Sequence, residues 1–240
     1  YALRIGIPIV PHYLSGIILN QGDRIMIDKM VGKTEVALYG LAYSIGMLVQ
    51  LFISGMNSAL TPWMYSKIKK GDIRSMRKVL QLLSIVVVGI AVALMLISPE
   101  MVLIFGSPKY REAVYVIPPV AASVFFIFIY NILSMPQFYY EKTQFLMAAS
   151  MAAAGANVVL NFIFIRLFGY IAAGYTTLAC YMLYSVGHYI VSKQILVNEG
   201  IQENLMNPGF LLACSVFLIG ASIICNLIFP YRILRYAILL

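Results

Sequence analysis

The chain has 240 residues, of which 17 are Lys or Arg and 9 are Asp or Glu, so charged residues make up only 11% of it. Ordinary soluble domains carry about 25% charged residues, whereas 62% of this chain is hydrophobic and its mean hydropathy is +0.89. These values exclude a soluble domain and a disordered chain, and three Cys are too few for a disulfide-rich secreted scaffold. The basic residues lie between apolar runs, which excludes a nucleic-acid-binding module.

Seven long stretches of the sequence contain no Asp, Glu, Lys or Arg, and their lengths suit membrane-spanning helices. A helix needs about 20 apolar residues to cross a hydrocarbon core about 30 Å thick. We therefore expect an all-α integral membrane protein, a polytopic helical bundle, rather than a β-barrel with its alternating strands. The stretches cover residues 5–22, 36–66, 79–99, 113–140, 143–165, 167–192 and 204–231. An eighth apolar segment opens at Arg232, and the sequence stops within it at Leu240.

The first predicted span carries ionisable and amide side chains, which are costly in a membrane and mark functional positions. At about 100° per residue they fall on one half of the helix, while Leu14, Ile18 and Ile25 lie on the other half. The polar residues are His12, Asn20, Gln21, Asp23, Arg24 and Asp28. Two interpretations stay open. In the first, Arg24 and Asp28, which are one turn apart, form an ion pair and neutralise each other. In the second, the polar half of the helix lines a hydrated cavity whose floor includes Arg24.

The second predicted span repeats this pattern with small and polar residues on one helical face. They follow one another at steps of three or four residues and are Tyr39, Tyr43, Gly46, Gln50, Ser54, Asn57 and Thr61. Such a stripe serves helix packing as readily as it lines a cavity, and both interpretations stay open. Gly55 and Pro62 predict a bend near the cytoplasmic end of this span.

The loop Lys67–Lys78 has six basic residues and one acidic residue. The positive-inside rule places it in the cytoplasm, although a site for anionic lipid headgroups would have the same composition. Alternating spans then place Glu141–Lys142 and Lys193–Pro208 on the same side as this loop. Ser107–Glu112 and Arg166–Gly169 fall on the opposite side, where the predicted loops are short.

The sequence contains no recognisable catalytic or metal-binding motif. It lacks HExxH, GxSxG, a Walker loop and CxxC, and Cys180, Cys214 and Cys225 lie in apolar spans as small hydrophobic residues. A membrane glycosyltransferase would need acidic residues in a sizeable outer loop, which the predicted topology does not offer. We therefore expect no enzyme activity, no cofactor and no metal, and a protein that moves a molecule rather than transforming it.

Three stretches resemble polysaccharide flippases of the multidrug/oligosaccharidyl-lipid/polysaccharide exporter superfamily. Residues 7–45, IPIVPHYLSGIILNQGDRIMIDKMVGKTEVALYGLAYSI, resemble the start of the second six-helix half of that family. The resemblance includes the pair Asp23–Arg24. The family's Pro-containing exit into a basic loop resembles residues 59–72, ALTPWMYSKIKKGD. A later pattern of Asn, Leu-Asn, an apolar run and a small-residue cluster resembles residues 156–182, ANVVLNFIFIRLFGYIAAGYTTLACYM, which depart from it at Leu167, where Pro is common.

The resemblance implies a transporter of two six-helix lobes that face a central cavity. Residues 1–198 would be the second lobe, helices seven to twelve of the whole protein, and residues 199–240 would be extra C-terminal transmembrane helices, one complete and one truncated. The N-terminal lobe is then expected to be a missing part of the same protein. A sequence that starts at Tyr1 without Met or a signal peptide agrees with that expectation.

The implied function is that of a flippase in the bacterial cytoplasmic (inner) membrane. It would translocate undecaprenyl-diphosphate-linked oligosaccharide for the O-antigen of lipopolysaccharide or for capsule. Expected partners are that lipid-linked oligosaccharide, membrane lipids, the missing lobe and polysaccharide polymerase machinery, with no nucleic acid. Two alternatives stay open: a cation-coupled multidrug exporter of the same superfamily, and a membrane glycosyltransferase or polymerase.

From the two polar faces we expect substrate-binding residues in the cavity and carboxylates that couple transport to an ion. The substrate-binding candidates are Arg24, Asn20, Gln21, His12, Tyr43, Gln50 and Asn57. The ion-coupling candidates are Asp23 and Asp28. Arg24 would pair with diphosphate oxygens of a lipid-linked sugar, whereas in a drug exporter one of the two carboxylates would bind the coupling cation.

Overall fold

The computed structural model describes residues 2–231, and every regular element in that range is helical. The α-helices are α1 (Ala2–Met30), α2 (Lys33–Gly46), α3 (Leu48–Lys69), α4 (Ile73–Phe105), α5 (Ile117–Tyr139), α6 (Thr143–Phe168), α7 (Ile171–Asn198) and α8 (Pro208–Ile228), and a 3-10 helix, η1, covers Pro108–Val116. The expected all-α fold is confirmed. The predicted eighth segment, 232–240, lies outside the described residues.

Five helical segments within residues 2–231 are long and apolar enough to cross a membrane, which confirms a polytopic membrane protein. They are Lys33–Lys69, Ile73–Phe105, Pro108–Tyr139, Thr143–Phe168 and Pro208–Ile228. α1 and α7, with 29 and 28 residues, also have the length of a crossing, although they are not among these five. Each carries buried polar side chains, Asp23 in α1 and His188 in α7. The structure therefore has a long helix at each of the seven predicted spans, two of which are more polar than the rest.

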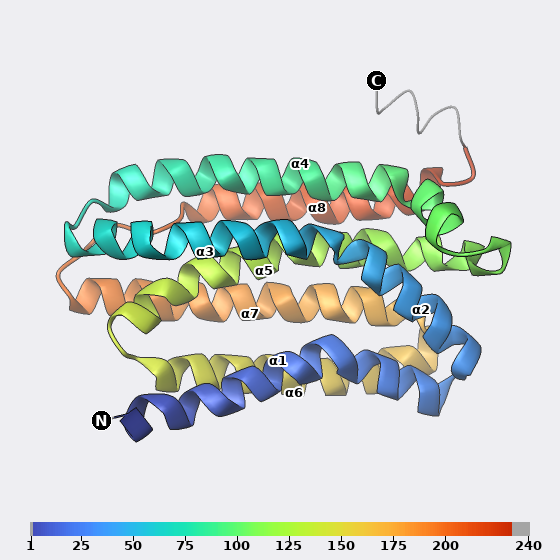
Figure 1. The fold of residues 1–240 in the computed structure, drawn as a ribbon, viewed down its shortest axis with the longest axis horizontal. Helices are drawn as coiled ribbons and strands as arrows, with labels where there is room; N and C mark the ends of the chain where they lie inside the picture. The colour runs from blue at the N-terminus through green and yellow to red at the C-terminus, as the bar shows by residue number, and fades with distance from the viewer. Residues whose placement is uncertain (1, 232–240) are drawn as a thin grey trace.

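The second predicted span is interrupted at Met47, between α2 and α3, and the two helices meet at an angle there (Figure 1). α3 continues through Gly55 and Pro62, so the bend predicted there does not end the helix and stays a prediction. The interruption coincides with close packing of Gly46 on α5, where a Cβ would lie 2.7 Å from Val120 Cγ1. A residue without a side chain lets the end of α2 approach α5 this closely.

The long helices lie side by side, with α5 and α7 in the middle of the bundle (Figure 1). α1 packs on α6 and α6 on α7, whereas α4 and α8 pack on the opposite side against α5. α5 is the most enclosed membrane-spanning segment, and its Phe125 and Phe128 are fully buried. A central apolar helix with neighbours on both sides provides the core on which the more polar α1 and α7 are held.

Loops alternate between the two ends of the bundle, as the sequence predicted (Figure 1). The end that carries Lys67–Lys78, called the basic end below, also carries the segment after α7, because Arg77 Nε donates a 2.7 Å hydrogen bond to the Asn204 carbonyl. Lys67 forms a 2.5 Å ion pair with Asp72, the residue that caps α4. The Lys67 hydrogen bond holds the pKa of the Asp72 carboxyl below its usual range. Which side of the membrane the basic end faces stays a prediction.

Candidate functional site

A polar cavity of about 760 Å³ lies between α1, the α2–α3 junction, α5 and α7. Its polar and aromatic lining residues are His12, Tyr13, Asn20, Gln21, Tyr43, Gln50, Tyr130, Asn131, Ser134, Phe138, Tyr181 and Tyr184. Five of the seven substrate-binding candidates are among them: His12, Asn20, Gln21, Tyr43 and Gln50. The structure thus brings together side chains that the sequence placed on two separate helical faces.

Hydrogen bonds between helices hold the lining of this cavity in place. Asn20 Oδ1 accepts from Tyr43 Oη of α2 at 2.8 Å and from Tyr181 Oη of α7 at 3.3 Å. His12 Nδ1 and Tyr184 Oη, from α1 and α7, lie 3.2 Å apart. Buried polar groups need such partners in an apolar environment, so α1 is positioned by its neighbours through the same face that borders the cavity.

An aromatic wall on α5 and α7 contributes residues that the analysis of the sequence did not assign to the cavity. The ring of Tyr130 lies nearly parallel to that of Tyr181, with centroids 6.3 Å apart, and its centroid is 4.5 Å from that of Tyr184. The sequence spacing could have indicated that these residues share one helical face. Tyr181 and Tyr184 of α7 are three residues apart, and Tyr130, Ser134 and Phe138 of α5 follow at steps of four.

Arg24 lies at the edge of the polar cavity rather than in its lining. Its Nη1 donates a 3.0 Å hydrogen bond to Gln21 Oε1, and its guanidinium carbon lies 5.3 Å from the centre of the Tyr43 ring. The Nε atom is buried and has no partner among the described residues. Arg24 therefore touches two residues that line the cavity.

The ion pair that was one interpretation of the first span is not formed: within the described chain, no ion pair joins Arg24 to Asp28. Asp28 is exposed on α1 and does not line the cavity. Asn57, the remaining candidate, lies on α3 outside the lining, and its buried Oδ1 atom has no partner within residues 2–231. The functional roles of these three residues stay predictions.

Asp23 is fully buried and is the centre of a hydrogen-bonded cluster, here called the Asp23 cluster. Its Oδ2 accepts from Tyr39 Oη of α2 at 2.5 Å and from Thr177 Oγ1 of α7 at 2.6 Å. Its Oδ1 accepts from Asn161 Nδ2 of α6 at 2.5 Å. One carboxylate therefore joins α1 to three other helices through hydrogen bonds.

The other members of the Asp23 cluster fix the orientation of Asn161. Thr176 Oγ1 donates to Asn161 Oδ1, and Asn161 Nδ2 also contacts Asn157 Oδ1 at 3.2 Å. The cluster thus gathers carboxylate, amide and hydroxyl oxygens, the atoms that hard cations prefer, and a carboxylate can equally take up a proton. Among the described residues, no group of three or more His, Cys, Asp or Glu is placed to hold a metal ion.

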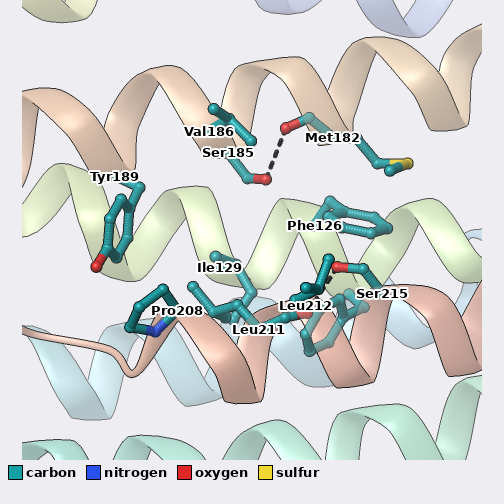
Figure 2. Close-up of a pocket in the computed structure, with 11 residues that line it drawn as sticks. Phe126, Ile129, Met182, Ser185, Val186, Tyr189, Pro208, Leu211, Leu212 and Ser215 are labelled. Atoms are coloured by element: carbon teal, nitrogen blue, oxygen red, sulfur yellow. Dashed lines mark hydrogen bonds between the residues drawn. The ribbon is translucent and has the colours of Figure 1, made fainter.

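A second groove, between α5, α7 and α8, differs from the polar cavity in being almost wholly apolar (Figure 2). Phe126, Ile129 and Leu211 lie along it. Its two serine hydroxyls donate to their own helices, Ser185 to the Met182 carbonyl at 2.8 Å and Ser215 to the Leu211 carbonyl at 2.7 Å. A groove with such a lining suits lipid chains or helix packing and does not suit a polar cargo.

Comparison with known proteins gives one family and two relatives. The profile of the MatE family matches residues 8–163, more than half of the chain. A protein of Haemophilus influenzae called protein 1 of the Lsg locus is 29% identical over 159 residues, which cover 63% of this chain and 38% of that protein. An uncharacterized membrane protein of the same organism is 30% identical over 152 residues, 60% of this chain and 36% of that protein.

The matched region therefore spans less than two fifths of the length of these two curated relatives. No solved structure matches the chain significantly. The family match covers α1 to most of α6, and hence the α1, α3 and α5 walls of the polar cavity and the Asp23 side chain.

Proposed function

The chain belongs to the MatE family, whose members are membrane transporters rather than enzymes, and we propose that the whole protein is a flippase for undecaprenyl-diphosphate-linked oligosaccharide. In this proposal it acts in a bacterial cytoplasmic membrane and supplies repeat units for a surface polysaccharide such as O-antigen or capsule. The polymerase machinery that consumes those units would be its functional partner. The resemblance of residues 7–45, 59–72 and 156–182 to polysaccharide flippases supports this choice within the superfamily.

The polar cavity is the observation that carries the proposal. The polar head of a lipid-linked sugar cannot cross hydrocarbon without losing its hydrogen bonds, at a cost of several kcal/mol for each uncompensated group. Amide and hydroxyl groups such as those of Asn20, Gln21 and Gln50 can replace water around such a head, and the Tyr130, Tyr184 wall offers flat surfaces to sugar rings. The lipid tail would remain in the bilayer.

The charge distribution favours an anionic cargo over a cationic drug. No carboxylate of the described chain lines the polar cavity, since Asp23 is enclosed in its own cluster and Asp28 is exposed elsewhere on α1. Arg24 lies at the cavity edge, where its guanidinium contacts Gln21 and Tyr43. A guanidinium in that position can donate charge-assisted hydrogen bonds to a diphosphate, whereas it would repel the cation that a multidrug exporter carries.

The Asp23 cluster supports a second part of the proposal, namely coupling of transport to an ion. Within residues 2–231, no cationic side chain forms an ion pair with Asp23, and a buried carboxylate without one is expensive unless it takes up a proton or a cation. Movement of α1 relative to α6 or α7 would change the donors around Asp23. Ion binding and helix arrangement would therefore be linked. This coupling would serve a flippase and an exporter alike.

We further propose that residues 1–198 form the second of two six-helix lobes and that residues 199–240 add C-terminal helices. The short span of the chain relative to its curated relatives agrees with a larger whole protein. Tyr13 and Leu51, which border the polar cavity, are 67% and 74% exposed. A facing lobe would cover this open side and complete the cavity, and alternating access between lobes would then move the head group.

Deletion of the complete gene in its own host tests the proposed function. We expect undecaprenyl-linked oligosaccharide to accumulate on the cytoplasmic face of the membrane, surface polysaccharide to disappear, and both defects to be reversed by the full-length gene. Normal surface polysaccharide without accumulation would contradict a flippase. Greater sensitivity to cationic drugs with normal polysaccharide would instead identify an exporter, and lipid-linked single repeat units on the outer face would identify a polymerase.

A further inference from the structure

Three buried polar side chains lie just beyond the polar cavity, between α5 and α7. Gln137 and His188 have no exposed surface and Ser192 is 1% exposed. Each has one atom without a partner in the described structure: Gln137 Oε1, His188 Nε2 and Ser192 Oγ. Buried polar atoms are nearly always hydrogen-bonded, to protein or to ordered water, so three such atoms on two adjacent helices require an explanation.

The hydrogen bonds that do exist determine what each free atom offers. Gln137 Nε2 donates to the Leu133 carbonyl at 3.3 Å and lies 2.8 Å from His188 Nδ1. Because a carbonyl can only accept, the amide nitrogen is correctly placed, and its second N–H points to Nδ1 as the acceptor. The neutral imidazole then carries its proton on Nε2. The three free groups are therefore an N–H donor on His188, a carbonyl acceptor on Gln137 and a hydroxyl on Ser192.

These groups continue the lining of the polar cavity toward the basic end. Ser134 and Phe138 of the cavity flank Gln137 on α5, and the rings of Tyr184 and His188 are 4.5 Å apart on α7. Tyr181, Tyr184, His188 and Ser192 follow at steps of three, four and four residues, which places them on one face of α7. A different face of α7, with Met182 and Val186, borders the apolar groove (Figure 2).

We propose that Gln137, His188 and Ser192 bind water inside the bundle and extend the polar cavity as a hydrated path toward the basic end. A buried water makes about three hydrogen bonds, and a donor, an acceptor and a hydroxyl supply that number. Ser84 and Ser123 are also fully buried but have no such need, because each donates to a carbonyl of its own helix. The inference holds whatever molecule the protein transports, so its failure and that of the proposed function are separate results.

Thiol accessibility in the full-length protein in membranes tests the proposal. Cysteines are replaced throughout, Ser192→Cys is introduced, and a small cationic methanethiosulfonate reagent is applied from the side of the basic end. Ser123→Cys is the matched control, since Ser123 is also fully buried but its Oγ donates to the Val120 carbonyl at 2.6 Å. We expect modification at position 192 and none at 123. Absence of modification at both positions, or equal modification at both, would overturn the path.

A second experiment tests the assignment to these three side chains. Adding Gln137→Leu and His188→Phe to the Ser192→Cys protein removes the free donor and acceptor, and we expect modification at 192 to be lost. Unchanged modification would overturn the assignment. If that variant does not accumulate in the membrane, hydroxyl-radical footprinting of the unmodified protein decides. His188 should then be oxidised and the equally buried Phe128 should not, and equal protection of both would overturn the proposal.

Discussion

Asn161 on α6 donates a 2.5 Å hydrogen bond from its side-chain amide to the carboxylate of Asp23 on α1, across 138 residues of sequence. Tyr39 and Thr177 add donors from α2 and α7 to the same carboxylate. The Asp23 cluster thus connects four helices through polar side chains in the interior of the bundle. Its loss should affect both the stability of the fold and any function that depends on how α1 moves.

Replacing Asp23 with alanine should destabilise the protein strongly. The change leaves the side chains of Tyr39, Asn161 and Thr177 without their shared acceptor, and each stranded buried donor costs about 1–3 kcal/mol. We expect the free energy of unfolding to fall by about 3 kcal/mol or more on that basis. Thermal unfolding of the full-length protein in detergent measures the effect.

Asp28→Ala is the matched control, since Asp28 is an exposed carboxylate on the same helix. Surface substitutions usually change stability by about 0.5 kcal/mol or less, so its melting temperature should stay close to that of the wild type. Equal melting temperatures for the Asp23→Ala and Asp28→Ala proteins would show that the hydrogen bonds of the cluster do not contribute as argued.

Ion coupling at Asp23 makes a separate prediction. An ion that binds only the folded protein stabilises it by about 2.7 kcal/mol at a concentration of one hundred times its Kd. If Na⁺ is the coupling ion, the melting temperature of the full-length protein should therefore rise when Na⁺ replaces K⁺ at constant ionic strength. If a proton is the coupling ion, the melting temperature should rise as the pH is lowered. Asp23→Asn, which keeps the size of the side chain, should abolish that dependence, and Asp28→Asn should retain it. The same dependence in Asp23→Asn would rule out Asp23 as the coupling site.

Gly46 and Gly55 should respond in opposite directions to alanine. A Cβ on Gly46 would lie 2.7 Å from Val120 Cγ1 and 2.9 Å from its Cβ, both in a stiff β-branched side chain, whereas a Cβ on Gly55 meets nothing within 4 Å. Overpacking typically costs about 1–3 kcal/mol, so Gly46→Ala should lower the melting temperature. Gly55→Ala should leave it unchanged or raise it, because alanine favours the helix by up to about 1 kcal/mol.

A compensating substitution identifies the cause of the Gly46 effect. Val120→Ala removes Cγ1, the atom nearest to the new Cβ, but keeps the Cβ of residue 120, so the double variant Gly46→Ala with Val120→Ala should recover part of the stability lost in Gly46→Ala alone. If the two losses were simply additive, the close approach of α2 to α5 would not be what requires glycine at position 46.

The helical architecture was predictable because it depends on local composition. Runs without charge located the helices of residues 2–231, except that the second run contains both α2 and α3, and the 3.6-residue period placed His12 and Asn20 of α1 on the face that meets the polar cavity. The interruption at Met47 was not predictable from local composition, and it coincides with the contact of Gly46 with Val120 of another helix, 74 residues later. Pro62 does not end α3, because a membrane helix can accommodate a proline.

The separation of Asp23 from Arg24 was also beyond the sequence alone. The two are neighbours in the chain, and a helical wheel places both near the polar half of α1. Their environments differ because Asp23 faces α6 and α7, while Arg24 lies over the Tyr43 ring of α2. Asn157 and Asn161, one turn apart in α6, were visible as polar residues in an apolar span, but only the fold shows Asn161 to be a donor to Asp23.

Membrane topology can be tested at an exposed residue of the basic end. Lys70 is suitable because it is exposed and has ordinary helical backbone angles, whereas its neighbour Gly71 has a φ of 68° that a cysteine would adopt only with strain. Lys70→Cys in intact cells should react with a membrane-impermeant thiol reagent only after permeabilisation. Lys109→Cys, at the opposite end of the bundle, should react at once. The reverse pattern would invert the proposed orientation.

Arg24 provides the sharpest test of the proposed cargo. Because Arg24 forms no ion pair with Asp28 in the described structure, Arg24→Ala does not strand a charge. It should lose the hydrogen bond to Gln21, about 0.5–1.5 kcal/mol, and the contact with the buried Tyr43 ring, about 0.5–2 kcal/mol. The double variant Arg24→Ala with Asp28→Ala should be additive within about 0.5 kcal/mol, as expected for independent sites.

Export should behave differently from stability in the same variants. If Arg24 donates to the diphosphate of the cargo, Arg24→Ala should lose surface polysaccharide while the protein remains at wild-type level in the membrane. Arg24→Lys should export at an intermediate level, since lysine keeps the charge but loses the two-pronged donor geometry. Adding Asp28→Ala should not restore export. Polysaccharide and protein level are measured in the same cells, and wild-type polysaccharide from the double variant would remove Arg24 from the substrate-binding site.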